Sequence, residues 1–530
     1  MNYSVKRDKV NTSCNLWKRF GTTLFAVIAF CGSAFANNLQ LTNISATTST
    51  ISFDISWDNS WNMSSAPSNW DAVWVVVKYQ DCNTEEKTWN QRILSTTSGN
   101  HSVSGGVLQV DAVTDGMGVF IRQSAVGTGN ISTSSVSLAF GTAFSNIANV
   151  NFELVGIEMV NVPEGAFYVG DGSTATPPLS QNSMGTNGTS SPKEITSEGG
   201  LSANTLAGYN NTAPTQHLAI SADFPKGYAA FYCMKYEVSQ NQYIQFLNLL
   251  PAAQQINRTA SSVTSSVGTL ALAPAATPSR NGIRIKTSAT GSPLSPAVYG
   301  ADLNNNGTFD EADDGGNIAC NYLNWYDLIA YLDWVALRPM TELEFEKAAR
   351  GPSSQGTPVV AAHVWNTTTI LQAKSDALSN AGQETEVSTA SGNGLCAYDA
   401  GNTLGPLRVG FAATGSTDRA GAGASYYGIL DLSGNVWEQA YHIGFNSGSG
   451  YGVAPAFTGV LGDGELGAIG FADATNWGGQ NGVVRSVVRG GNWNNISSYC
   501  QTSNRSFVTS AGGENSTRIN RTGGRGVRQF

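Results

Sequence analysis

Apolar and polar side chains alternate one by one between residues 51 and 57, and this pattern restricts the start of the chain to β-structure. Ile51, Phe53, Ile55 and Trp57 alternate with Ser52, Asp54 and Ser56, which is the period of a strand with one buried face. Residues 70–79 form a longer apolar run that indicates a more fully buried strand, and residues 107–110 and 118–121 indicate further strands. Residues 37–152 are therefore predicted to form an all-β sandwich domain, with a binding or spacer role.

The segment before this domain has the features of a signal peptide. Basic residues near the N-terminus precede a short apolar run at residues 24–30, and Ala34 and Ala36 supply the small residues of a cleavage site. We expect residues 1–36 to be a signal peptide and the mature chain to be secreted, periplasmic or at the cell surface. No later stretch approaches the roughly 20 apolar residues that a transmembrane helix requires.

The amino-acid composition argues against a nucleic-acid-binding function. The chain has 59 glycines, only 13% charged residues and a formal net charge of −9, which together describe a loop-rich fold with polar, uncharged surfaces. Sites for nucleic acid need clustered Lys and Arg to neutralise phosphates, and no such cluster is present in the sequence. A protein or surface ligand is the expected partner.

The cysteines allow more than one arrangement. Cys14 and Cys31 lie in the signal peptide, which leaves Cys82, Cys233, Cys320, Cys396 and Cys500 in the mature chain. In an oxidising compartment this odd number permits at most two disulfides and leaves at least one free thiol. The spacing of these residues does not fix their pairing.

The remainder of the chain mixes strands with a few helices. We expect strands at residues 154–162 and 231–236, a long surface loop over residues 171–214, and helices over residues 238–250 and 325–336. A third helix should start at Thr341, because Thr341 and Glu344 have the spacing of a capping box. After Arg350 loops and short strands predominate.

A twelve-residue segment in this part has the spacing of a calcium-binding loop. Oxygen-bearing side chains occupy positions 1, 3, 5, 9 and 12, Gly307 holds the turn position, and the backbone carbonyl of Thr308 would add a ligand. The predicted calcium ligands are Asp302, Asn304, Asn306, Thr308, Asp310 and Asp313. The ion would clamp a long insertion rather than take part in catalysis.

Five sequence blocks, in order, resemble the formylglycine-generating enzyme (sulfatase-modifying factor) family. They are residues 162–170, 236–239, 337–351, 427–438 and 488–493, and Arg525 to Arg528 stands where the family's last strand lies. The resemblance implies an α+β, C-type-lectin-like fold over residues 153–530, following the separate all-β sandwich. Within the blocks, Trp437 and Trp493 are expected to be core anchors, and Arg338, Glu344, Glu346 and Arg350 to form ion pairs.

The resemblance also implies two kinds of metal site. Asn435 and Glu438 match a calcium site of the family, as oxygen ligands suited to a hard cation. Active members hold copper(I) between two thiolates, which are ligands that this soft ion prefers. The second of those cysteines corresponds to Cys500, whereas the first corresponds to Asn495, whose amide cannot act as a soft anionic ligand. Cys396 is the one thiol that we name as a replacement, and a structural disulfide between Cys396 and Cys500 is the other possibility.

Two functions follow from the resemblance. The first is an exported, non-catalytic binding or structural module at the cell surface or in an extracellular assembly, as in bacterial relatives that serve as scaffolds. Residues 492–505 are rich in Asn, Ser and Tyr, the side chains of adaptable binding loops. The alternative is a copper-dependent oxidase that converts a protein cysteine to formylglycine, with Cys500 as the catalytic residue.

Overall fold

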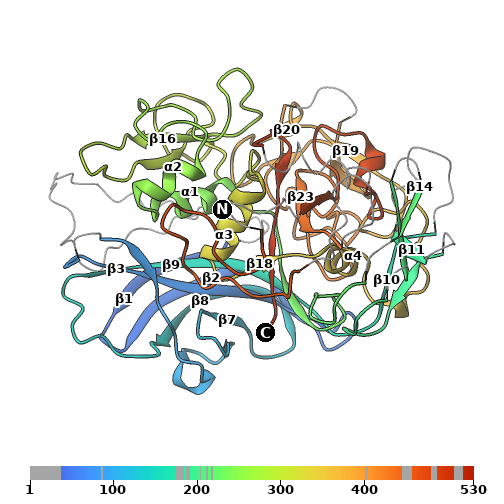
Figure 1. The fold of residues 1–530 in the computed structure, drawn as a ribbon, viewed down its shortest axis with the longest axis horizontal. Helices are drawn as coiled ribbons and strands as arrows, with labels where there is room; N and C mark the ends of the chain where they lie inside the picture. The colour runs from blue at the N-terminus through green and yellow to red at the C-terminus, as the bar shows by residue number, and fades with distance from the viewer. Residues whose placement is uncertain are drawn as a thin grey trace.

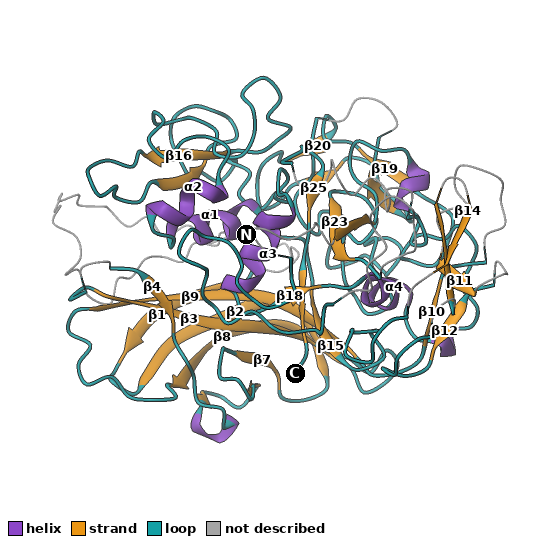
Figure 2. Cartoon of the chain, viewed as in Figure 1, coloured by secondary structure: helices purple, strands orange, loops and turns teal. Residues whose placement is uncertain are grey.

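The computed structural model describes residues 38–84, 87–172, 184–186, 191–202, 205–210, 213–216, 219–399, 404–443, 456–478, 486–505 and 517–530 (Figure 1). The predicted signal peptide, with Cys14 and Cys31, lies outside these residues. Strands and loops make up most of the described chain, and helices are few (Figure 2).

The N-terminal region contains one complete four-stranded sheet. Its order is β1 (Gln40–Ala46), β2 (Thr50–Asn62), β8 (Gly127–Ala139) and β5 (Ser102–Val103). In β2 the side chains of Ile51, Phe53, Ile55 and Trp57 are buried and those between them are partly exposed. The predicted alternation is therefore confirmed.

A second, eight-stranded sheet joins the two halves of the chain. Along its main path the order is β18 (Arg338–Pro339), β26 (Gly526–Arg528), β15 (Phe231–Met234), β9 (Val150–Val162), β3 (Asp71–Asp81), β7 (Val119–Gln123) and β6 (Leu108–Ala112), and β4 (Trp89–Gln91) pairs with β3. Strand β9 pairs with β3 along one edge and with β15 along the other. The predicted domain boundary between residues 152 and 153 thus falls inside β9, and the sheet continues across it.

Strand β3 explains why this sheet is buried on both faces. Val73, Val75 and Val77 pack with Ile51, Phe53 and Ile55 of the four-stranded sheet. Trp74 and Val76 point the other way, into a core shared with the helices of the second region. The Trp74 indole donates a hydrogen bond of 2.9 Å to the backbone carbonyl of Val335. A strand with apolar side chains on both faces needs a layer on each side, and the helices supply the second layer (Figure 2).

Four α-helices are present among the described residues: α1 (Gln240–Asn248), α2 (Ala252–Arg258), α3 (Trp325–Trp334) and α4 (Glu342–Arg350). Capping boxes at Ser239, Asn324 and Thr341 start α1, α3 and α4, and the one at Thr341 confirms the prediction. Helix α3 ends earlier than residue 336 because Ala336 adopts a φ of 55°, which a continuing helix excludes.

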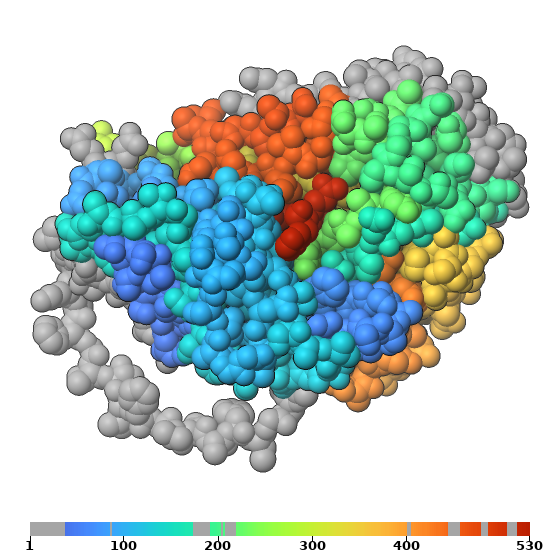
Figure 3. Space-filling model, turned by 90° about the horizontal axis from the view of Figure 1, so that it is seen from below, coloured from blue at the N-terminus to red at the C-terminus, as the bar shows by residue number. Residues whose placement is uncertain are grey.

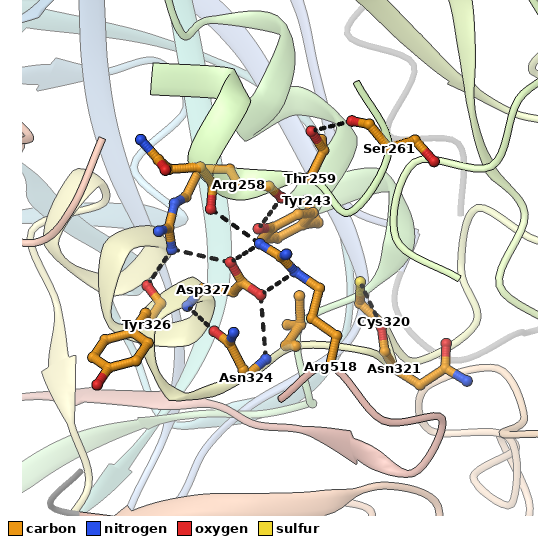
Figure 4. Close-up of polar contacts among 12 residues, drawn as sticks. Tyr243, Arg258, Thr259, Ser261, Cys320, Asn321, Asn324, Tyr326, Asp327 and Arg518 are labelled. Atoms are coloured by element: carbon orange, nitrogen blue, oxygen red, sulfur yellow. Dashed lines mark hydrogen bonds and ion pairs between the residues drawn. The ribbon is translucent and has the colours of Figure 1, made fainter. Parts of the chain in front are cut away.

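A buried carboxylate fixes three of these segments together (Figure 4). Asp327, near the start of α3, accepts a hydrogen bond of 3.0 Å from Arg258 at the end of α2. Arg518, from the C-terminal segment, donates to the same carboxylate at 2.7 and 2.8 Å. The side chain of Asp327 is fully buried, so its charge depends on these partners.

Short strands complete the second region. They are β10 (Phe167–Val169), β11 (Met184–Thr186), β12 (Lys193–Ile195), β13 (Leu206–Asn210), β14 (Ala213–Gln216), β16 (Ile283–Thr287), β17 (Val298–Ala301), β19 (Leu371–Ala373), β20 (Leu378–Ser379), β21 (Val387–Ser388), β22 (Leu395–Ala397), β23 (Trp437–Tyr441), β24 (Ser486–Arg489) and β25 (Thr522–Gly523). Strands β11 to β13 lie within residues 171–214 and β14 begins there, so the prediction of a plain loop was wrong. Each of these strands has only three to five residues, which is too short to show a period.

The C-terminus packs against the N-terminal region (Figure 3, dark red). Arg528 forms an ion pair with Asp115, and its guanidinium lies 4.3 Å from the centre of the Trp74 ring. These contacts reinforce the continuity of the large sheet. Within the described residues, every helix is too short or too polar to cross a membrane.

Candidate functional site

Two thiols from distant parts of the second region meet in its core. Cys396 lies in β22, and Cys500 ends a 3₁₀ helix (Ser497–Cys500). Both are free cysteines, with 1% and 0% exposure, and both belong to one apolar cluster. Burial and the contact with Cys500 raise the pKa of the Cys396 thiol well above its usual range, so its neutral form is favoured.

Two glycines leave room for these sulfur atoms. A Cβ at Gly434 would lie 2.4 Å from the Cys396 sulfur, and one at Gly491 would lie 2.6 Å from the Cys500 sulfur. Their φ angles are 86° and 80°, in the left-handed region where glycine has no steric penalty. The Ser-Gly-Asn and Arg-Gly-Gly turns of the sequence blocks thus pack directly against the thiol pair.

Hydrogen bonds to main-chain carbonyls hold the two cysteine segments in place. The Cys396 thiol donates to the Ser433 carbonyl at 3.0 Å, and the Ser433 hydroxyl donates to the Cys500 carbonyl at 2.8 Å. Nδ1 of His363 also donates to the Cys500 carbonyl, at 3.1 Å. Burial lowers the pKa of His363, which favours the neutral ring.

Asn495, at the position of the family's first thiolate, forms part of a turn. Its side-chain oxygen accepts a hydrogen bond from the amide of Asn492, and its backbone carbonyl accepts one from Asp399. Of the two copper-binding cysteines of the family, this chain therefore has only the second, Cys500. The thiol that lies beside it is that of Cys396. We expected one of two relationships, a replacement thiol or a disulfide, and the structure contains two reduced thiols in contact.

Asn435 and Glu438, predicted as ligands of a calcium site, contact other protein groups. The Asn435 amide donates to Glu237 at 2.6 Å, and its oxygen accepts from the Leu407 backbone at 2.8 Å. Glu438 is fully buried and forms an ion pair with Arg525 at 2.7 Å. Burial, reinforced by the nearby carboxylates of Asp431 and Glu438, raises the pKa of Glu237 well above its usual range. These contacts support structural roles for both residues.

The predicted calcium loop brings together a somewhat different set of oxygens. Asp302 is 1% exposed, and its carboxylate accepts from the backbone N–H of Asn306 at 3.1 Å. Asp310 is directed to the neighbouring strands, where it accepts from Lys286 at 2.6 Å and from the Ala301 N–H at 2.9 Å. Glu311, Asp313 and Asp314 offer oxygens within 4.8 Å of one another. Glu311 and Asp314 were not part of the predicted ligand set, which stays a prediction.

Buried ion pairs fix α4, as predicted from its sequence block. Arg338 pairs with Glu344 and Arg350 with Glu346. Arg489 and Arg505 add further pairs to Glu342. Although burial opposes the charged form, these two guanidinium groups lower the pKa of Glu342 to about 2. The arginine of the Arg-Gly-Gly block is therefore structural.

Two sizeable cavities lie away from the thiol pair. One of about 660 Å³ is walled by polar side chains of α1 and by the calcium-loop residues Asp310 and Glu311. The other, of about 450 Å³, lies where the N-terminal strands meet the second region. Trp61, Tyr236 and Tyr426 line the second cavity, and the ammonium group of Lys235 lies 4.4 Å from the Trp61 ring centre. Neither cavity is lined by Cys396 or Cys500.

Of the comparisons with known proteins, the match to a family model agrees with the sequence blocks. No curated protein matches the chain. Among solved structures, Treponema denticola variable protein 1 is similar to 71% of this chain and 96% of its own, with 13% identity and a TM-score of 0.32. The family model described as the sulfatase-modifying factor enzyme 1-like domain matches residues 156–529. Because this match covers more than half of the sequence, the chain belongs to the family of sulfatase-modifying factor enzyme 1-like domains.

Proposed function

We propose that this chain is an exported, non-catalytic binding or structural module of the family, at the cell surface or in an extracellular assembly. The observation that carries the proposal is the burial of Cys500, which has no exposed surface. A client cysteine would have to contact this thiol or a metal bound to it. We take the family region to have the C-type-lectin-like fold, used here for its surfaces.

The electrostatics of the thiol pair support the same conclusion. Copper(I) requires thiolates, whereas burial raises the pKa of Cys396. Arg525 is paired with Glu438, and Arg489 with Glu342 and Glu346, so the charges of these two guanidinium groups are already balanced by carboxylates. The arrangement therefore favours a neutral Cys396 thiol, packed in the core beside Cys500.

The junction between the two regions is where we expect a ligand to bind. Aromatic side chains dominate hot spots of binding sites because they bury large areas with few rotatable bonds. The cavity of about 450 Å³ combines such side chains with Lys235 and Arg419. A hydrogen bond of 2.8 Å from Asn69 to the Tyr427 carbonyl ties the two regions together at this cavity. The N-terminal strands thus contribute to the site rather than only spacing it from a surface.

An activity assay tests the proposal. The purified protein would be incubated with copper(I), oxygen and a cysteine-containing sulfatase peptide, and the peptide would be examined by mass spectrometry for formylglycine. An active family member serves as the positive control. We expect no conversion by this chain, and turnover that is lost in Cys500→Ser would contradict the proposal.

A copper-dependent oxidase is the second candidate, and the contact between Cys396 and Cys500 favours it. Two cysteines are the kind of ligand that copper(I) prefers. Cys396, however, lies in β22, whereas the first cysteine of the family corresponds to position 495. When bound, copper(I) would supply oxygen chemistry, and these cysteines would hold it. Competition with a copper(I) chelator distinguishes the candidates: retention of one copper that depends on both Cys396 and Cys500 would favour the oxidase. Cys233→Ser and Cys320→Ser are matched controls, because both residues are also buried free thiols.

A further inference from the structure

The loop that follows β17 contains an unusual concentration of carboxylates around one backbone turn. Asp302, Glu311, Asp313 and Asp314 contribute four carboxylates, and the first three act electrostatically on Asp314. The nearest cation to Asp302 is Arg284, whose Nε lies 4.0 Å from the carboxylate. Within the part of the chain that the structure describes, one guanidinium at that distance leaves most of this negative charge without a counterion.

The backbone of the loop is already folded around this charge. The N–H of Asn306 donates to Asp302 at 3.1 Å and to the side chain of Asn304 at 3.0 Å. The N–H of Thr308 donates to the side chain of Asn306 at 2.7 Å. Gly307, with a φ of 84°, reverses the chain direction between them.

Asp314 supplies an independent observation. It is 1% exposed, and one of its oxygens accepts from the Glu311 N–H at 2.8 Å. Its other oxygen, Oδ1, is buried and has no hydrogen-bond partner. A buried carboxylate oxygen without a partner carries a large desolvation penalty, and a cation bound among the neighbouring carboxylates would remove it.

We propose that this loop binds a calcium ion through Asp302, Glu311, Asp313 and Asp314, with the Asn304 side chain beside them. Calcium fits because it takes six to eight oxygen ligands in flexible geometry. The proposed set omits Asn306, Thr308 and Asp310 of the spacing motif and adds Glu311 and Asp314. Asp310 faces Lys286 and the Ala301 N–H, so we exclude it from the ligands and include Asp314.

Calcium would rigidify the wall of a cavity. Glu311 lines the cavity of about 660 Å³, together with Asn241 and Gln245 of α1. The ion would fix the position of the Glu311 side chain and neutralise the negative charge of the carboxylates at this side of the cavity. The proposal is independent of the thiol pair and of the proposed binding role.

Two single substitutions separate the proposed ligand set from the motif. The purified protein is freed of metal with EGTA and titrated with calcium chloride by calorimetry. Asp314→Asn removes one negative ligand, so the calcium affinity should fall at least about tenfold. Asp310→Asn preserves the proposed set, so its calcium affinity should stay within about twofold of the wild type.

Thermal unfolding checks that a loss of calcium binding does not result from a destabilised fold. In EGTA, Asp314→Asn should melt no lower than the wild type, because an unpartnered buried charge is removed. In calcium the wild type and Asp310→Asn should gain stability by mass action, and Asp314→Asn should gain less at the same calcium concentration. Absence of calcium binding by the wild type would overturn the proposal. So would loss of binding in Asp310→Asn combined with normal binding in Asp314→Asn.

Discussion

Glu438 accepts two hydrogen bonds of 2.7 Å from the guanidinium of Arg525, and both side chains are buried. Arg525 also donates to the backbone carbonyls of Met234, Lys235 and Leu430. The pair therefore joins β23 to the segment before β26 and to the end of β15. A bidentate pair with every donor satisfied is the kind of buried ion pair that does not need a metal.

Removing the charge of Glu438 should destabilise the fold. Glu438→Gln leaves Arg525 buried without its counterion, and breaking such a pair typically costs about 3–5 kcal/mol. Urea unfolding followed by tryptophan fluorescence measures the free energy of unfolding. Combining Glu438→Gln with Arg525→Met should recover part of the loss, because no unpaired charge then remains. A calcium affinity that falls in Glu438→Gln, with stability unchanged, would instead support a cation site at Asn435 and Glu438.

Asp327 should be more sensitive to substitution than the surface-edge residue Asp115. Both pair with arginines, but the side chain of Asp327 is 0% exposed and that of Asp115 is 33% exposed. We expect Asp327→Asn to cost roughly 3–5 kcal/mol, since Arg258 and Arg518 lose their shared anion. Asp115→Asn should cost about 1 kcal/mol or less. Equal losses in the two variants would contradict the importance of the buried cluster.

Gly491 should not tolerate a methyl group. A Cβ there would lie 2.8 Å from the backbone nitrogen of Cys500, so a smaller residue at position 500 cannot relieve the clash. Gly268 provides the control, because its φ of 85° is similar and nothing lies within 4 Å of its Cβ position. Gly268→Ala should cost only the backbone strain of about 1–2 kcal/mol, and Gly491→Ala roughly 1–3 kcal/mol more. Melting temperatures of the two variants test the difference, and equal values would argue against the described packing.

Acid should destabilise the chain through Glu342. Its pKa is about 2 in the folded protein and ordinarily 4.5, so the unfolded chain binds the proton more tightly. The ionised Glu342 carboxylate therefore contributes about 3 kcal/mol to the free energy of unfolding. This contribution is complete above about pH 4.5 and is lost as the pH falls toward 2. Urea unfolding between pH 5 and pH 2.5 measures this slope for the wild type.

Arg505→Lys is the matched variant for the acid experiment. Arg505 donates to both oxygens of Glu342, and lysine retains the charge without this two-point contact. The pKa of Glu342 should move back toward its ordinary value, and the slope of stability against pH should become shallower. An unchanged slope would mean that the acid sensitivity arises from other carboxylates.

Local patterns predicted the individual elements well. The alternation at residues 51–57 predicted β2, and the Thr341 capping box predicted the start of α4, because both signals depend on neighbours in the chain. The ordered blocks predicted the family region, which matches residues 156–529. Within the blocks, the ion pairs of Arg338 and Arg350 follow from spacing along one helix and its entry strand.

Long-range relationships could not be predicted in the same way. Strand β9 pairs with β3 from the N-terminal region and with β15 from the second region, and a sequence pattern shows only that β9 is apolar. Cys396 and Cys500 meet because β22 and the 3₁₀ helix converge, which spacing does not encode. The direction of each carboxylate could not be predicted either: Asp310 faces Lys286 and the Ala301 N–H, and Asp314 accepts from the Glu311 N–H.

The state of Cys500 in the native protein tests the central claim most directly. A thiol-specific reagent would be applied to folded protein with and without copper(I), and the labelled cysteines would be identified by mass spectrometry. The account predicts that Cys396 and Cys500 react only after unfolding, whether or not copper(I) is present. A Cys500 that reacts in the folded protein, and is protected by one equivalent of copper(I), would contradict the account and establish an open metal-binding thiol.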